Sequence, residues 1–265
     1  MSSSRLAALV VASLVPVLLT ATPALAGGAV TSHYVAMGDS YASGQGTGRY
    51  DRGSGDCARG PRAYPALLAT ATEAESFTSV ACSGATTADV LGKQIAALTP
   101  ATTLVTVSIG GNDIGAPAAM RECTIGSESG CDRILANAKN VIARSLSGKL
   151  DTTYSAIRKA APAAKVVVVG YPRIFEPGSY ACDVLTRPRR AEVVSITDSL
   201  AAVISARAAA AGFSFLDGRA AFAGHELCSP RPWINEPGLP ADDSYHPNKA
   251  GHANGYLPAL TALLG

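Results

Sequence analysis

The apolar positions along the chain form short continuous runs that are separated by longer alanine-rich stretches. TLVTVSI (Thr103–Ile109) and KVVVVG (Lys165–Gly170) are apolar without regular polar alternation. Such runs are typical of parallel strands that are covered on both faces. The predicted strands are His33–Met37, Ser76–Ala81, Thr103–Ile109, Lys165–Gly170 and Phe213–Leu216.

The alanine-rich segments between these runs have the composition of helices. The predicted helices are Tyr64–Thr72, Thr87–Leu98, Asp132–Ala161, Arg189–Ala211 and Pro247–Leu263. Strands that alternate with helices indicate a parallel sheet with helices on both faces. The pattern therefore predicts an α/β fold, a three-layer α/β/α sandwich around a central parallel sheet.

The first residues have the layout of a targeting signal. Arg5 precedes an apolar run over Leu6–Leu19, and Ala-Leu-Ala precedes Gly27. This order is typical of a cleaved secretory signal peptide. A membrane anchor is the alternative, but a spanning helix needs about 20 apolar residues. We expect a signal at residues 1–26 and one domain at residues 27–265.

Composition narrows the function classes further. The 265 residues carry a formal net charge of only +2, which gives no basis for a nucleic-acid partner or an anionic membrane surface. No stretch after the signal looks long and apolar enough to span a bilayer, so we expect an extracellular protein with no stable membrane anchor. The remaining length suits one domain with its own core, and we expect a monomer.

The cysteines fit an oxidising compartment. The six are Cys57, Cys82, Cys123, Cys131, Cys182 and Cys228, all after the signal. An even number in an exported chain predicts three disulfides, although six cysteines permit fifteen connectivities. The simplest is sequential: Cys57–Cys82, Cys123–Cys131, Cys182–Cys228. A zinc site is disfavoured because the chain has no C-x-x-C pair and its four histidines are scattered.

Small polar residues follow each of the first three predicted strands. The segments are GDSY (Gly38–Tyr41), ACSGATT (Ala81–Thr87) and IGGND (Ile109–Asp113), and DDSYHPNKAGH (Asp242–His252) leads into the last predicted helix. In an open parallel sheet the carboxyl ends of the strands share one edge, where α/β proteins place their sites. The first three segments are therefore expected to meet there.

These four blocks, in this order, resemble the SGNH hydrolases, also called the GDSL family. They are GDS after the first strand, a lone glycine after the second, GxND after the third, and D-x-x-H before the last helix. The blocks span nearly all of the mature chain. Together with the export signal, they resemble the secreted actinobacterial lipases and esterases of that family. The resemblance implies a flavodoxin-like α/β/α fold and a serine ester hydrolase that uses no cofactor and no metal.

The resemblance implies that Ser40 is the nucleophile and His246 its general base. A serine hydroxyl is a weak nucleophile until a base takes its proton, and imidazole titrates near neutral pH. Pro247 restricts His246 to an extended conformation and suits the first turn of a helix. The alternative for His246 is a surface histidine at a helix start, and for Ser40 a helix-capping role beside Asp39.

The resemblance also implies three oxyanion donors: the backbone N–H groups of Ser40 and Gly84 and the side-chain amide of Asn112. One such donor typically lowers the barrier by about 2.7–4 kcal/mol. Glycine at position 84 lets the backbone approach a substrate closely. The structural alternatives are a plain turn glycine and a left-handed turn asparagine.

The group that orients His246 stays open at the level of sequence. Asp243 precedes the histidine by three residues, as in D-x-x-H, and a carboxylate there could accept from Nδ1. Some family members use a backbone carbonyl instead, which Ser244 or a loop residue near Trp233 could supply. Asp242 lies beside Asp243, and the sequence does not distinguish which faces the ring.

Several other positions receive a prediction. Asp39 is expected to bind backbone N–H groups of its own turn. His252 is expected to lie on the surface, and the small residues Ala42–Gly48 to leave room for an acyl chain.

The function that we expect is a secreted lipase or carboxylesterase acting on fatty-acyl esters. Phospholipase and carbohydrate O-acetyl esterase activities fit the same four blocks. A non-catalytic binding protein would predict loss of one of the four motif residues, and none is lost. A metal-dependent hydrolase would need clustered ligands, for which no pair of histidines is placed.

Overall fold

Five parallel strands form one sheet in the order β2-β1-β3-β4-β5. The strands are β1 (His33–Gly38), β2 (Ser76–Ser79), β3 (Leu104–Ser108), β4 (Lys165–Val169) and β5 (Ser214–Leu216). This is the flavodoxin-like order, in which the direction of winding reverses between β1 and β3. The predicted α/β fold is therefore confirmed, with strand ends within two residues of those expected.

The computed structural model describes residues 32–176, 178 and 182–265. The predicted signal peptide, residues 1–26, lies outside these residues. The helices are α1 (Ser40–Ser43), α2 (Tyr64–Ala71), α3 (Thr87–Asp89), α4 (Ala116–Ile125), α5 (Glu128–Arg144), α6 (Leu146–Ala160), α7 (Arg187–Ala210), α8 (Gly218–Ala221) and α9 (Leu257–Leu264). Short 3-10 or π segments are η1 (Arg52–Cys57), η2 (Val90–Gln94), η3 (Ile95–Ala97), η4 (Ala241–Asp243) and η5 (Gly251–Tyr256).

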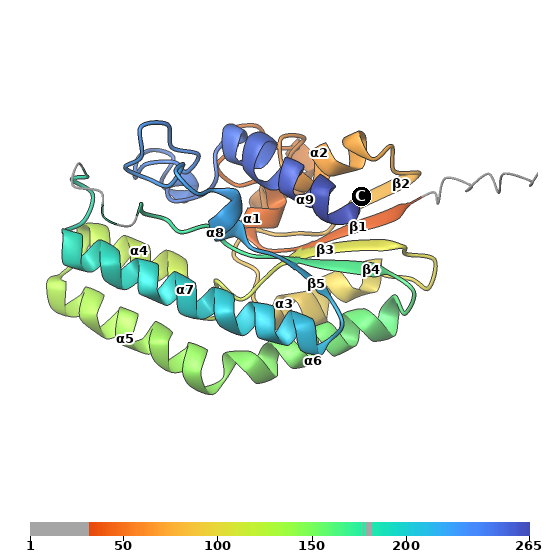
Figure 1. The fold of residues 1–265 in the computed structure, drawn as a ribbon, viewed down its shortest axis with the longest axis horizontal. Coiled ribbons are helices and arrows are strands. Elements are labelled where there is room, and N and C mark those ends of the chain that lie inside the picture. Colours follow the sequence, from red (N-terminus) through yellow and green to blue (C-terminus); the bar gives the residue numbers. More distant parts are fainter. Residues whose placement is uncertain (1–31, 177, 179–181) are drawn as a thin grey trace, which may run out of the picture. The chain divides into compact units, whose positions relative to one another are not determined.

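Helices cover both faces of the sheet (Figure 1). Because side chains alternate along a strand, neighbouring residues of β1 enter different cores. Val35 and Met37 join the core beneath α5, α6 and α7, whereas Tyr34 and Ala36 join the core beneath α2 and α9. Burial on both faces stabilises the sheet, because each fully buried aliphatic or aromatic side chain contributes about 1.5–3 kcal/mol.

Several helix boundaries differ from the prediction. The single helix expected over Asp132–Ala161 is wrong, because Ser145 leaves helical geometry (φ −131°, ψ −24°) and separates α5 from α6. α4 was not expected, and the helix predicted from Thr87 is one α turn followed by η2 and η3. The last helix does not begin at Pro247, since the Asn248 side chain accepts from the next N–H groups and starts a new turn.

α7 corrects the expectation that no later stretch could span a bilayer. By length and hydropathy alone this 24-residue helix could do so. In this fold its apolar face, which includes Val193, Leu200 and Ile204, lies in the core against the sheet. The internal helix of a globular α/β domain meets the same two criteria.

The sequential disulfide pairing is confirmed. Cys57–Cys82 ties η1 to the turn after β2, Cys123–Cys131 ties α4 to α5, and Cys182–Cys228 ties the segment before α7 to the loop before η4. All three join segments at the edge of the sheet where the strands end. The disulfides restrain the long loops at this edge, which have little hydrophobic core of their own.

Reducing the disulfides is expected to destabilise the fold. Loss of a native disulfide in a secreted domain typically costs about 2–5 kcal/mol, which corresponds to a fall in Tm of at least about 5 °C for a domain of this size. Calorimetry with and without reductant would measure it, with free thiols quantified as a control. An unchanged Tm in protein shown to be fully reduced would contradict a stabilising role.

Candidate active site

The turn after β1 is fixed by an unusually close approach of two strands. Gly38 has φ +122°, and a Cβ there would lie 2.2 Å from the carbonyl oxygen of Ser108 on β3. The buried Gln94 side chain accepts from the Gly38 N–H at 2.7 Å and donates to its carbonyl at 2.9 Å. Only glycine fits this position, and the turn delivers Ser40 to the first residue of α1.

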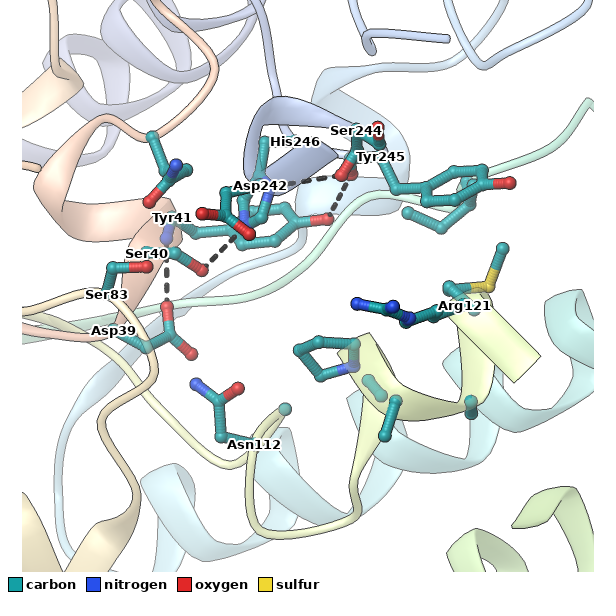
Figure 2. A pocket seen from close by; sticks show the side chains of 18 of the residues that line it. Asp39, Ser40, Tyr41, Ser83, Asn112, Arg121, Asp242, Ser244, Tyr245 and His246 are labelled. Atoms are coloured by element: carbon teal, nitrogen blue, oxygen red, sulfur yellow. Dashed lines mark hydrogen bonds between the residues drawn. The ribbon is translucent and has the colours of Figure 1, made fainter. Parts of the chain in front are cut away.

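Ser40 and His246 form a hydrogen bond, although 206 positions separate them. The distance from Ser40 Oγ to His246 Nε2 is 2.8 Å, and His246 Nδ1 lies 3.1 Å from the backbone carbonyl of Ser244 (Figure 2). A carbonyl only accepts, so Nδ1 carries the proton. Nε2 therefore accepts from the serine hydroxyl, which is the tautomer that general-base chemistry requires.

The environment keeps His246 neutral. Removal of the ring from water lowers its pKa to about 4. The Ser244 carbonyl and the nearby Asp243 and Asp242 carboxylates oppose this shift but do not reverse it. At neutral pH the ring is a free base that can take the Ser40 proton.

Asp243 does not occupy the place predicted for an orienting acid. Its Oδ1 accepts from Tyr50 Oη at 2.6 Å, from Gln45 Nε2 at 3.1 Å and from the Gly46 N–H at 3.3 Å. The Nδ1 partner of His246 is the Ser244 carbonyl. Of the two alternatives that the sequence left open, the structure therefore has the Ser244 carbonyl and not the Asp243 carboxylate beside the ring, and Asp243 as the orienting acid is wrong. The Asp243 carboxylate secures the loop after α1, and its charge favours the imidazolium.

Asp39 ties the turn after β1 to the turn after β3. As predicted, its Oδ1 accepts from the Tyr41 N–H at 3.0 Å and caps α1. Its Oδ2 accepts from the Tyr171 hydroxyl, which in turn accepts from the Gly111 N–H at 3.0 Å. Complete burial raises the pKa of Asp39 to about 7, and the Tyr171 hydrogen bond partly offsets this. This network fixes the position of Gly111, the residue that precedes Asn112, relative to the turn that carries Ser40.

The three predicted oxyanion donors line the same pocket. The Asn112 amide donates one hydrogen to the Ala85 carbonyl at 2.9 Å, which fixes its orientation and leaves the second hydrogen for a ligand. Gly84 has φ +78°, and nothing lies within 4 Å of the position that a Cβ would take. Among the described residues, the N–H groups of Ser40 and Gly84 have no hydrogen-bond acceptor. The arrangement can therefore receive a negatively charged oxygen.

Tyr245 is a site residue that the sequence motifs did not reveal. Its backbone has φ +64°, an unusual conformation for a bulky residue. Two contacts hold it: Tyr41 Oη donates to the Tyr245 carbonyl at 2.9 Å, and the Tyr245 hydroxyl bonds to Thr124 on α4. The residue next to His246 thus joins the histidine loop to the wall of the pocket.

His252 is buried, which contradicts the surface position predicted for it. Its Nδ1 accepts from the Tyr64 N–H at 3.0 Å, and burial lowers its pKa to about 3. The ring packs against Tyr64 and Tyr256. It therefore joins η5 to α2 and takes no direct part in the site.

A pocket of about 910 Å³ opens beside Ser40 and extends between helices. Its apolar lining comes from α4, α5 and α7 and from Ile114 before α4: Ile114, Ala119, Met120, Leu135, Ala138, Ile196 and Leu200. Of the segment 42–48, only Gln45 contributes, because this segment is mostly buried in the fold. The expectation that it makes room for an acyl chain is therefore wrong.

No metal centre is formed by the residues described. Within 32–176, 178 and 182–265, no group of three or more His, Cys, Asp or Glu side chains is placed to hold an ion.

Comparison with known proteins gives a consistent result. Residues 36–253 match the model of the GDSL-like Lipase/Acylhydrolase family. A protein named Lipase 1 from Streptomyces coelicolor is 46% identical over 241 residues, which cover 91% of this chain and 90% of that protein.

Two solved structures share the fold closely. A phospholipase A1 from Streptomyces albidoflavus NA297 is 47% identical with a TM-score of 0.83, over 86% of this chain and 98% of that one. An extracellular lipase from Streptomyces rimosus is 45% identical with the same TM-score, over 88% and 99%. The chain belongs to the GDSL-like lipase/acylhydrolase family, and it is a carboxylic ester hydrolase.

Proposed function

We propose that this protein is a secreted lipase or carboxylesterase that cleaves fatty-acyl esters through a Ser40 acyl-enzyme. One observation carries the proposal: Ser40 Oγ lies 2.8 Å from His246 Nε2, and both residues line a largely apolar pocket of about 910 Å³. The pocket offers space for an acyl chain beside the hydroxyl that would attack it.

In the first half-reaction His246 Nε2 takes the Ser40 proton while the serine oxygen attacks the ester carbonyl. The carbonyl oxygen becomes an oxyanion that accepts from the Ser40 N–H, the Gly84 N–H and the Asn112 amide. The N-terminal end of a helix favours this negative charge as well. The tetrahedral intermediate then collapses, and the leaving alkoxide takes the proton from His246.

The second half-reaction reverses the roles. A water molecule gives its proton to His246 Nε2 and attacks the acyl carbon, and the proton then returns to Ser40 Oγ as the fatty acid leaves. In both halves the imidazolium is oriented by Nδ1–H donation to the Ser244 carbonyl. The charges of Asp242 and Asp243 favour that cation.

The pocket supports a long acyl group over an acetyl group. Pockets of 300–1,000 Å³ with apolar walls suit ligands that bury most of their surface, and an acetyl group would leave most of this one unfilled. Relatives named as lipases point to the same substrate class. Both arguments disfavour a carbohydrate acetyl esterase.

Phospholipid is the second candidate substrate, and Arg121 is the observation that favours it. Among the described residues that line the pocket, Arg121 is the only lysine or arginine, and it forms no ion pair. Figure 2 shows it across the pocket from Ser40. Arginine is well suited to phosphate oxygens, and one similar structure is named a phospholipase A1.

Secretion is part of the proposal. The charged, apolar and small-residue order of residues 1–26 supports an export signal. Three disulfides suit an oxidising compartment, and a similar structure is named an extracellular lipase.

Ser40→Ala is expected to abolish turnover of p-nitrophenyl esters. Loss of the nucleophile removes the acyl-enzyme route, so kcat should fall by about 10⁴-fold or more. Esters from acetate to palmitate would be assayed with both proteins, and the wild type should prefer medium or long chains. Equal activity in the two proteins would place catalysis elsewhere.

A pocket variant provides the matched control for chain length. Ala138 lies on the α5 side of the pocket, so Ala138→Leu should shift the preference toward shorter chains and leave acetate turnover nearly unchanged. The same chain-length profile in the variant would argue against an acyl chain in this pocket.

Asp243→Asn is expected to lower kcat far less than the loss of a histidine-orienting acid would. In a serine protease, the amide substitution of a histidine-orienting aspartate lowers kcat by about 10⁴-fold. Here the orienting group is a carbonyl of the main chain. We therefore expect a loss below about 100-fold, which reflects the altered charge and the contacts to Tyr50 and Gln45. A loss near that of Ser40→Ala would restore Asp243 as the acid.

Activity is expected to persist in mild acid. Protonation of His246 inactivates the base, and its pKa is lowered to about 4, so kcat/KM should fall below about pH 5 rather than near pH 6.5. The Asp39→Asn variant is the control, because the pKa of Asp39 is about 7. An acid limb near 6.5 that survives in Asp39→Asn would contradict a depressed pKa for His246.

A further inference from the structure

The two most exposed large apolar side chains among the described residues are Ile125 and Leu239. They are 73% and 96% exposed, whereas the other exposed residues of this kind, Phe77, Leu91 and Leu263, are each 37% exposed. Single exposed apolar residues are common on protein surfaces. Ile125 and Leu239 differ from other exposed apolar residues in their position.

Both residues lie at the mouth of the catalytic pocket. Ile125 is the last residue of α4 and lines the pocket itself. Leu239 lies between Gly238 and Pro240, which both line it. α4 and the loop that precedes η4 lie at the same end of the fold (Figure 1). Ile125 thus belongs to the pocket lining, and Leu239 lies between two residues of that lining and also lines a neighbouring cavity of about 220 Å³.

Neither side chain is on a loosely attached segment. Thr124, beside Ile125, bonds to the Tyr245 hydroxyl. The turn of Leu239 is held by the Gly238 N–H, which donates to Ser244 Oγ at 3.1 Å. The backbone segments that carry the two side chains are thus tied to the loop that carries His246.

The charges at the mouth restrict what can cover it. Asp56 and Asp242 line the pocket and are exposed, and Arg121 is the only lysine or arginine in the described lining. An anionic surface would be repelled by the exposed carboxylates. A surface without net charge could contact Ile125 and Leu239 without this electrostatic repulsion.

We propose that Ile125 and Leu239 insert into the surface of a lipid aggregate without net charge and hold the pocket mouth against it. The inference rests on the proposed function in that this surface also supplies the ester. Apolar side chains at a lipid interface gain the free energy of leaving water. Insertion of Ile125 and Leu239 would hold the mouth of the pocket against the lipid, so that an acyl chain could enter the pocket without passing through water.

The test compares the double variant Ile125→Ser/Leu239→Ser with the wild type and with Leu263→Ser. Leu263 is the matched control because it is an exposed leucine on α9, outside the pocket lining. Each protein is sedimented with vesicles of ether-linked phosphatidylcholine, which the enzyme cannot hydrolyse. Burial of two aliphatic side chains predicts binding that is about tenfold weaker or more in the double variant and unchanged in Leu263→Ser.

A soluble substrate separates docking from catalysis. Hydrolysis of ester phosphatidylcholine vesicles should fall in step with vesicle binding in the double variant, and by at least tenfold more than hydrolysis of monomeric p-nitrophenyl butyrate, whose acyl chain can also contact Ile125 in the pocket lining. Leu263→Ser should match the wild type on both substrates. Unchanged vesicle binding by the double variant would overturn the proposal, as would an equal loss on the soluble ester. Inactivity of the wild type on every ester would refute the proposed function and leave the vesicle result to be judged separately.

Two further measurements address other occupants of the surface. Vesicles that contain phosphatidylglycerol should bind more weakly than phosphatidylcholine alone, and tighter binding would overturn the choice of an uncharged surface. Sedimentation velocity should show the same monomer for the wild type and the double variant. A wild-type dimer that the double substitution dissociates would overturn the proposal in favour of an interface between copies of this chain.

Discussion

The contact between the end of β1 and the backbone of β3 is the constraint on which the site depends. Gly38 lies so close to Ser108 that no side chain fits between them, and the Asp39 N–H donates to the Ser108 carbonyl at 2.9 Å. The Gln94 side chain accepts from the Gly38 N–H and donates to the Gly38 carbonyl, which also accepts from the Cys82 N–H at 2.9 Å. Ser40 is therefore held at the point where the winding of the sheet reverses, beside the turn that presents Asn112.

The sheet could be predicted from the sequence because central parallel strands are apolar on both faces. KVVVV is such a run, and β4 occupies it. The helices were harder, because alanine-rich sequence continues through their breaks. Nothing at Ser145 marks the boundary between α5 and α6 apart from one weak helix former. That boundary is set by the packing of each helix against its neighbours, which a local pattern does not contain.

The candidate site divides in the same way. Ser40, Gly84 and Asn112 follow strands whose ends must share an edge, so their meeting could be predicted. The spacing of Asp243 and His246 did not determine which group faces Nδ1, because that depends on the backbone conformation of the two residues between them. The apolar pocket could not be predicted for another reason: the sequence does not distinguish Leu135 and Ala138, which line it, from residues of an ordinary core.

The use of a main-chain carbonyl as the histidine's partner has a consequence for how this enzyme can change. A substitution removes a side chain but leaves the peptide group in place, so no single replacement at Ser244 deletes the acceptor. The backbone conformation of the loop around Ser244 must be preserved instead. Tyr41 and Asn235, which lie outside this loop, stabilise it by donating hydrogen bonds to the carbonyls of Tyr245 and Asp243. Side chains around the pocket can therefore vary, by drift or by design, while Ser40 and His246 keep their hydrogen bond.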